Sequence, residues 1–146
     1  MQEKIAIIGL GYVGLPLSIT FNKNFKVVGF DIDKNRIKQL TKLNDVTKEV
    51  SKKELRDAKK ILFTSDPKEL DDCGIYIVTV PTPINKANSP NLSSVINATK
   101  MISKKMKKDS IVIYESTTFP GCTEEICVPI LKRYTDLIYN KSFFCG

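Results

Sequence analysis

The sequence contains no histidine among its 146 residues. This absence excludes catalysis by a serine or cysteine nucleophile paired with a histidine base, and it excludes zinc binding by an HExxH motif. Any acid–base chemistry carried out by this chain must therefore use a carboxylate, a lysine, a hydroxyl group or water.

Patterns for metal binding, secretion and membrane insertion are missing as well. The four cysteines, Cys73, Cys122, Cys127 and Cys145, form no CxxC pair and lack the spacing of metal ligands. We expect reduced, mostly buried thiols and no metal site. No apolar run reaches the length of a membrane span, and Ile5–Leu10 is too short and wrongly flanked for a signal peptide. The sequence therefore predicts a cytoplasmic protein without a membrane partner.

Acidic residues are in the minority, with 16 Asp and Glu against 23 Lys and Arg, so the formal net charge is +7. The lysines concentrate at 48–60 and 100–108, where they alternate with acidic or apolar residues as on solvated helix faces. The densest run, Lys104–Lys108, has no interleaved aromatic residue for stacking on bases. We predict no nucleic-acid partner.

Apolar, β-rich runs alternate with helical patterns along the chain. The expected strands are Lys4–Ile8, Lys26–Phe30, Ile61–Thr64, Gly74–Val80, Ser110–Tyr114 and Ser142–Cys145. The expected helices are Tyr12–Asn22, Lys34–Lys42, Lys52–Lys59, Leu92–Lys107 and Cys122–Arg133, with one turn at Pro67–Leu70. This alternation predicts the α/β class: a Rossmann-type doubly wound parallel sheet of six strands, ordered 3-2-1-4-5-6, with helices on both faces.

A glycine motif, Gly9-Leu-Gly-Tyr-Val-Gly14, follows the first expected strand, and Asp31 ends the second. This is the spacing of a first βαβ unit that binds a dinucleotide. Gly9 permits the tight turn, Gly11 lets the backbone approach the pyrophosphate, and Gly14 lets the helix pack close to the sheet. The N–H groups at the helix start would face the diphosphate. The alternative is a glycine-rich turn without a ligand.

Asp31 favours NAD over NADP, because its carboxylate would accept a hydrogen bond from a ribose 2′-hydroxyl and repel a 2′-phosphate. Two further segments should reach the same edge of the sheet, where the carboxyl ends of parallel strands bind ligands. They contain Thr82, in Val80-Pro-Thr-Pro83, and Thr117, in Glu115–Gly121. We predict that Thr82 contacts the cofactor; the alternative is a turn hydroxyl bonded to its own backbone.

Several motifs together resemble the UDP-glucose/GDP-mannose dehydrogenase family. They are Gly9–Pro16, Val80–Pro83, Glu115–Thr117 and Pro120–Glu125. The likeness covers essentially the whole chain, as the family's N-terminal NAD-binding domain. Tyr114–Thr117 and Phe119–Glu125 look most like the branch that oxidises UDP-N-acetylhexosamines for surface polysaccharides.

The resemblance implies an enzyme that oxidises C6 of a UDP-sugar from an alcohol to a carboxylate, reducing two NAD⁺ and passing through a cysteine thiohemiacetal. It implies that the backbone of Tyr12 and Val13 contacts the pyrophosphate and that Asp31 and Arg36 flank the adenosine ribose. Arg36 has the alternative of a solvated helix residue.

The resemblance also implies that Thr82 and Thr117 line the nicotinamide side. Thr117 matches a threonine implicated in the family's water and proton relay, and it is our only catalytic candidate. The alternative for Thr117 is a helix cap, because hydroxyl side chains favour that position.

The family's other catalytic residues do not map onto this sequence. Its glutamate lies in a Ser-Pro-Glu motif just past Gly146, and its lysine, asparagine and nucleophilic cysteine lie farther on, beyond a connecting helix. We therefore expect residues 1–146 to form one NAD-binding domain, without the central helix and the substrate domain, and inactive alone. The resemblance implies a homodimer for the full-length protein.

Two other functions stay open from the sequence. One is a stand-alone NAD-sensing module that gates a partner protein. The other is a different NAD-dependent dehydrogenase, such as a hydroxy-acid oxidoreductase, although Val80–Pro83 and Ser116–Gly121 argue against it. A Ser-Pro-Glu motif and a downstream Gly-x-Cys segment past Gly146 would indicate the UDP-sugar enzyme.

Overall fold

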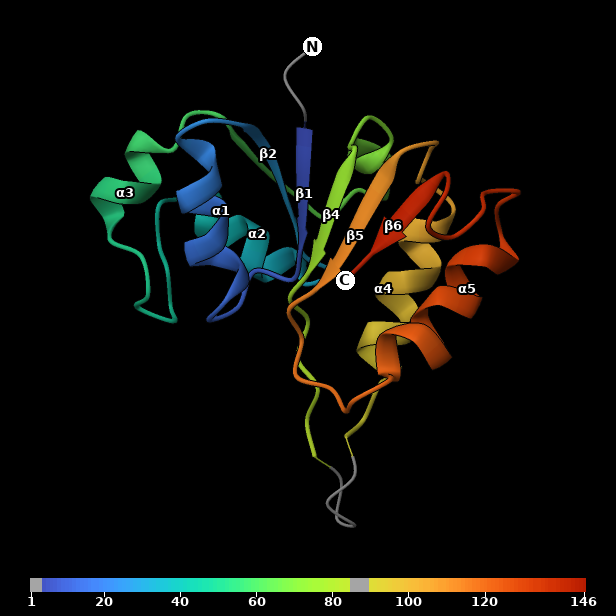
Figure 1. The fold of residues 1–146 in the computed structure, drawn as a ribbon. Coiled ribbons are helices and arrows are strands. Elements are labelled where there is room, and N and C mark those ends of the chain that lie inside the picture. The colour runs from blue at the N-terminus through green and yellow to red at the C-terminus, as the bar shows by residue number, and fades with distance from the viewer. Residues whose placement is uncertain (1–3, 85–89) are drawn as a thin grey trace.

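The computed structural model describes residues 4–84 and 90–146. Its strands are β1 (Lys4–Ile8), β2 (Lys26–Phe30), β3 (Ile61–Thr64), β4 (Ile75–Val78), β5 (Ser110–Tyr114) and β6 (Phe143–Cys145). Its helices are α1 (Gly14–Asn22), α2 (Lys34–Thr41), α3 (Lys52–Asp57), the 3₁₀ turn η1 (Pro67–Leu70), α4 (Ser93–Ser103), the π-helix η2 (Thr123–Cys127) and α5 (Val128–Arg133). The strands form one parallel sheet in the order β3-β2-β1-β4-β5-β6, which confirms the predicted topology (Figure 1).

The sheet divides the hydrophobic core in two, because successive residues of a strand point to opposite faces. On one face, Ile5 and Ile7 of β1 pack with apolar residues of α1, α2 and α3. On the other face, Ala6 and Ile8 pack with apolar residues of α4 and α5. Figure 1 shows these two helix groups on opposite sides of the central strands. The continuous apolar runs in the sequence follow from this double cover.

Four helices differ from the sequence-based expectation. Two of them end early: α3 at Asp57 rather than Lys59, and α4 at Ser103 rather than Lys107. The other two differ at their starts. The first, α1, begins at Gly14 rather than at Tyr12, so that the residues before it form a turn. The helix after β5 begins as the π-helix η2, in which the Val128 N–H donates to the Thr123 carbonyl five residues back. The next residue, Pro129, has no N–H to continue an α-helical ladder. This geometry buries both Cys122 and Cys127, which an α-helix would separate by about 140° around its axis.

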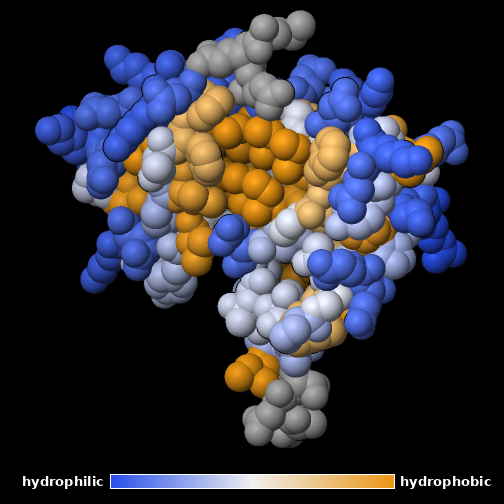
Figure 2. All heavy atoms as spheres, viewed as in Figure 1, coloured by the Kyte–Doolittle hydropathy of each residue, from blue (hydrophilic) through white to orange (hydrophobic). Residues whose placement is uncertain are grey.

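The apolar sheet face beside α1 is left partly open over β4, β5 and β6. Ile75, Ile111 and Ile113 are only partly buried, and Phe144 is 43% exposed. Figure 2 shows apolar side chains reaching the surface in this region, flanked by hydrophilic ones. Contiguous exposed apolar surface of this kind is typical of sites that contact a ligand, a membrane or another part of a protein.

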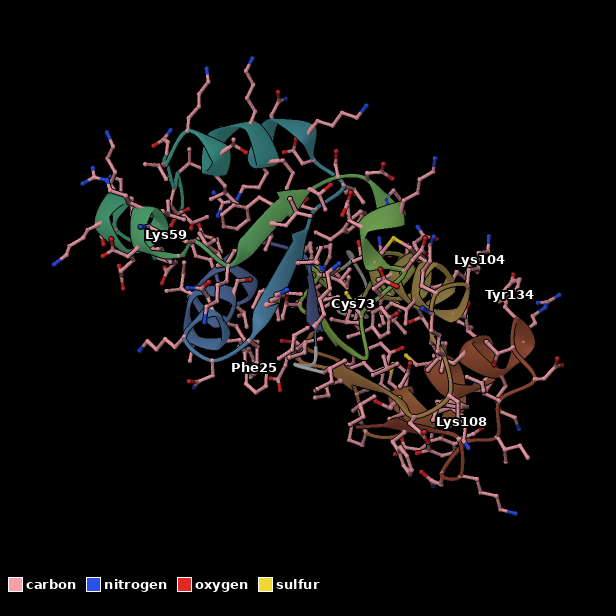
Figure 3. All side chains as sticks on the ribbon, turned by 90° about the horizontal axis from the view of Figure 1, so that it is seen from above. Phe25, Lys59, Cys73, Lys104, Lys108 and Tyr134 are labelled. Carbon is pink, nitrogen blue, oxygen red and sulfur yellow. The ribbon has the colours of Figure 1, made fainter. Side chains whose placement is uncertain are left out.

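The dense lysine run lies where α4 leads into β5. Lys105 pairs with Asp71 at 2.5 Å, and Lys107 lies 3.4 Å from Asp72. The Lys104 ammonium lies 5.7 Å from the centre of the Tyr134 ring, and Figure 3 shows these two side chains next to each other.

Within the described residues, no helix is long and apolar enough to cross a membrane.

All four cysteines are free thiols, as expected. Cys73, Cys122 and Cys127 are buried, and Cys145 is partly buried in β6. Burial raises the pKa of Cys73 and Cys127 to about 11 and that of Cys145 to about 12. Such thiols carry almost no thiolate at neutral pH, so they are poor nucleophiles. In residues 4–84 and 90–146, no cluster of three or more metal-binding side chains occurs.

Candidate cofactor site

A cleft of ≈ 660 Å³ opens at the carboxyl edge of the sheet. It lies at the lower end of the strands in Figure 1, and Figure 2 shows the molecule hollowed there beside the projecting loops that follow β4 and β5. Eight of the nine residues that the sequence predicts for the cofactor line it: Gly9, Gly11, Tyr12, Val13, Asp31, Arg36, Thr82 and Thr117. The ninth, Gly14, is the first residue of α1 and packs against Gly9 and Thr79.

The glycine loop is held against the exit of β4. Gly9 has a φ of +99°, which a residue with a side chain rarely adopts. A Cβ added to Gly14 would overlap the Gly9 carbonyl oxygen and the Thr79 hydroxyl, so α1 approaches the sheet as closely as its backbone allows. Thr79 Oγ1 donates to the Gly9 carbonyl at 2.7 Å and locks the two segments together.

The turn before α1 offers free hydrogen-bond donors to the cleft. In the described part of the chain, no group accepts a hydrogen bond from the N–H of Gly11, Tyr12 or Val13. A Cβ added to Gly11 would meet no atom within 4 Å, so its missing side chain leaves open space. Unpaired N–H groups at the start of a nine-residue helix, with its positive dipole end, make a site suited to a diphosphate.

Asp31 lies at the exit of β2 and faces the same turn. Its Oδ2 accepts a 2.8 Å hydrogen bond from the Leu10 N–H, and its Oδ1 accepts one of 2.9 Å from the Asp33 N–H. Each oxygen keeps a lone pair for a ribose hydroxyl. Asp31 thus shapes the glycine loop in addition to the ribose-binding role that the sequence predicts.

Arg36 is only 7% exposed, which rules out the alternative of a solvated helix residue. Its Nε donates to the Leu10 carbonyl at 2.8 Å, and its Nη1 lies 2.9 Å from Asp45 Oδ1. Arg36 belongs to the lining of the cleft, and its guanidinium is held by Asp45 in the loop that follows α2.

Hydroxyl groups join the two loops that follow β4 and β5. Thr82 Oγ1 donates to the Thr117 carbonyl at 2.6 Å, and Ser116 Oγ donates to the Val80 carbonyl at 2.8 Å. The alternative in which Thr82 bonds to its own backbone is therefore wrong. Thr117 is also not a helix cap, because the next helix begins at Thr123 with Cys122 in the cap position. In the described residues, the Thr117 hydroxyl has no partner and is free for a ligand.

Sequence reasoning missed three residues that shape the cleft: Thr79, Ser116 and Asp45. Thr79 and Ser116 act through contacts to residues 70 and 36 positions away, which no local pattern reveals. Asp45 accepts hydrogen bonds from the N–H groups of Thr47, Glu49 and Val50, and an Asp-x-Thr pattern in a loop is a weak signal for such a turn.

The chemistry of the cleft fits a dinucleotide. Residues with free N–H donors line one part of it, and Asp31 and Arg36 also belong to its lining. The exposed aliphatic side chains of Ile32 and Val46 add apolar lining. These residues match the diphosphate, the ribose hydroxyls and an aromatic base of NAD.

Comparison with known proteins agrees with this geometry. The model of the UDP-glucose/GDP-mannose dehydrogenase family, NAD-binding domain, matches residues 3–143. The UDP-N-acetyl-D-glucosamine 6-dehydrogenase of Salmonella typhi is 49% identical over 145 residues, which is 99% of this chain and 34% of that protein. Protein CapL of Staphylococcus aureus is 45% identical over 146 residues, 100% of this chain and 34% of CapL. The chain thus spans about a third of the length of these curated relatives.

A solved structure of similar fold supports the same family. The UDP-D-ManNAc dehydrogenase from Pyrococcus horikoshii superposes with a TM-score of 0.91 and 30% sequence identity. The superposition covers 97% of this chain and 35% of the P. horikoshii chain.

Proposed function

The chain belongs to the UDP-glucose/GDP-mannose dehydrogenase family as its NAD-binding domain, and from this membership we propose the following activity. The chain is the cofactor domain of an enzyme that oxidises C6 of a UDP-N-acetylhexosamine to a uronate with two NAD⁺, in surface polysaccharide biosynthesis. The observation that carries the proposal is the turn Gly11–Val13, whose free N–H groups face the cleft beside Asp31.

The choice of a UDP-N-acetylhexosamine rests on the relatives. The S. typhi protein, at 49% identity, oxidises UDP-N-acetyl-D-glucosamine, as its name states. The P. horikoshii protein, at 30% identity, is named for the manno-configured sugar. The higher identity favours the gluco-configured substrate.

The residues of this chain would perform the binding and orienting steps. The N–H groups of Gly11, Tyr12 and Val13 would hold the pyrophosphate, and Asp31 and Arg36 the adenosine ribose. Bound NAD⁺ supplies the hydride acceptor for the oxidation of C6. Thr82 and Thr117 would fix the nicotinamide end, where the free Thr117 hydroxyl can pass a proton to or from water.

The remaining catalytic groups would lie outside these 146 residues. In the described part of the chain no thiol is both exposed and acidic, since burial raises the pKa of Cys73, Cys127 and Cys145. The open apolar face over β4, β5 and β6, with Phe144 43% exposed, supports the proposal that further protein packs on this domain. For the whole protein we propose a homodimer in the cytoplasm, where NAD and UDP-sugars are available.

The experiment that tests this proposal is a chimera. This chain replaces the corresponding third of the S. typhi enzyme, and NADH formation is followed with UDP-N-acetyl-D-glucosamine. We expect two NADH per sugar from the chimera and none from the 146-residue chain alone. Turnover by the chain alone would contradict the proposal. A chimera that folds and binds NAD⁺ but stays inactive would favour the NAD-sensing module instead.

A further inference from the structure

The carboxylate of Asp45 is the centre of the loop between α2 and α3. Its Oδ1 accepts hydrogen bonds from the N–H and the hydroxyl of Thr47, at 3.0 and 2.7 Å. Its Oδ2 accepts from the N–H groups of Glu49 and Val50, at 2.9 and 3.0 Å. The Asp45 side chain is 1% exposed, so one loop wraps completely around this carboxylate.

The same carboxylate holds Arg36. Its Oδ1 lies 2.9 Å from Arg36 Nη1, whose side chain is 9% exposed. Arg36 Nη2 lies 3.5 Å from the Thr47 hydroxyl, and Arg36 Nε donates to the Leu10 carbonyl at 2.8 Å. Leu10 lies inside the glycine loop. A continuous chain of contacts therefore runs from Asp45 through Arg36 to the backbone that faces the pyrophosphate.

The charges indicate what would follow if one of these contacts were removed. Removing the partner of a buried ion leaves the other charge uncompensated, which the protein relieves by moving that charge toward water. Without Asp45, the guanidinium of Arg36 would turn toward the open cleft and release the Leu10 carbonyl. Burial opposes the ionised form of Asp45, but the hydrogen bonds from Thr47 and Val50 and the ion pair with Arg36 outweigh it and lower the pKa to about 2. Asp45 is thus fully charged at neutral pH.

We propose that Asp45 is a positioning residue for the cofactor: it touches no part of NAD, but it fixes Arg36 and, through the Leu10 carbonyl, the glycine loop. This inference rests on the proposed function, because it assumes that the cleft binds NAD. According to this inference, the affinity for the cofactor depends in part on Asp45, a residue that lies in the loop after α2 and outside the glycine motif.

The first test compares two variants that remove the same charge from the same loop. Asp45→Asn removes the carboxylate at the centre of the network. Glu49→Gln is the matched control, because the Glu49 side chain is exposed and only its backbone joins the network. Calorimetric titration of the 146-residue chain with NAD⁺ should show about tenfold weaker binding for Asp45→Asn. Glu49→Gln should stay within about twofold of the unmodified chain.

A double-mutant cycle separates positioning from a general loss of structure. If Asp45 acts through Arg36, then Asp45→Asn will weaken NAD⁺ binding in the unmodified chain but not in the Arg36→Met variant. A role in loop stability alone would make the two losses multiply. Multiplied losses, or equal affinity of Asp45→Asn and the unmodified chain, would overturn the inference.

Thr47→Val provides a second route if Asp45→Asn does not fold. It keeps the buried carboxylate and removes the hydroxyl that contacts both Asp45 and Arg36. We expect about threefold weaker NAD⁺ binding from the loss of this hydrogen bond, and unchanged affinity would count against the inference. Failure of the unmodified chain to bind NAD⁺ would instead refute the proposed function, so the two failures are distinguishable.

Discussion

The N–H of Leu10 donates a 2.8 Å hydrogen bond to Oδ2 of Asp31, across 21 positions of sequence. The carboxylate that would bind the ribose therefore also holds the glycine loop in shape. The Leu10 carbonyl is held from the other side by Arg36 Nε at 2.8 Å. The loop is organised in advance for its ligand, which lowers the entropy lost on binding.

We predict that Asp31→Asn will reduce the preference for NAD over NADP. The amide keeps the size of the carboxylate but no longer repels a 2′-phosphate. The ratio of the NADP⁺ to the NAD⁺ dissociation constant should fall about tenfold. NAD⁺ binding should weaken as well, because an amide has one acceptor oxygen for the two N–H groups of Leu10 and Asp33. Titration of each variant with both dinucleotides measures the ratio.

The control for this prediction is Asp33→Asn. It removes an equal charge two residues away, from an exposed side chain that accepts a hydrogen bond from the Asn35 N–H at the start of α2. It should leave the NADP⁺ to NAD⁺ ratio nearly unchanged. An equal shift in both variants would mean that general electrostatics, rather than Asp31, selects the cofactor.

Alanine at two glycines of the same motif should affect two different properties: cofactor binding at Gly11 and stability at Gly14. A methyl group at Gly11 meets no atom of the chain within 4 Å, so Gly11→Ala should fold normally and bind NAD⁺ about tenfold more weakly, because it fills ligand space. A methyl group at Gly14 overlaps backbone and Thr79, so Gly14→Ala should lose about 3 kcal/mol of stability. Urea unfolding and NAD⁺ titration of both variants test this. A stable Gly14→Ala variant would contradict the structure.

Acid should destabilise the protein through Asp45. Its folded-state pKa is lowered from the ordinary value of 3.8 to about 2, so its ionised form stabilises the fold above pH 4. That contribution, about 2 kcal/mol, is lost as the pH falls from about 4 to 2. Urea unfolding of the unmodified chain and of Asp45→Asn measures the effect. The stability difference between them should shrink as the pH falls through this window; a constant difference would contradict the prediction.

Removal of the Thr82 hydroxyl should loosen the part of the cleft that we propose for the nicotinamide. Thr82→Val preserves the shape of the side chain and leaves the Thr117 carbonyl without its 2.6 Å donor. We expect a loss of about 1 kcal/mol in stability and weaker NAD⁺ binding. Binding of ADP, which lacks the nicotinamide half, should be unchanged. Equal losses for NAD⁺ and ADP would place Thr82 elsewhere in the site.

The periodicity of apolar residues and the spacing of the glycines were enough to predict the order of the strands and most of the helices. The strand Ile61–Thr64 and the turn Pro67–Leu70 have the predicted bounds, because local apolar pattern and turn chemistry decide them. The Ser51-x-x-Glu54 pattern at the start of α3 is local in the same way: it forms a capping box, and both of its hydrogen bonds are present.

The π-helix η2 and the roles of Thr79 and Asp45 could not be predicted in this way. The π-helix precedes Pro129, which has no N–H and lies at the start of α5. The role of Thr79 depends on its contact with the glycine loop, and that of Asp45 on the buried side chain of Arg36. Such features arise only when distant segments come together. Residues named from the motifs do line one cleft, but Thr79 and Asp45, which hold them in place, lie outside every motif.

The two hydroxyl bonds between the loops after β4 and β5 run in opposite directions, because each loop gives one hydroxyl and one carbonyl. A loop transplanted from a distant dehydrogenase would bring only half of this exchange. Grafting the segment with Thr82 alone, or the segment with Ser116 alone, would leave a donor and an acceptor without mates. Engineering of this domain for another substrate must therefore replace both loops together, as one unit.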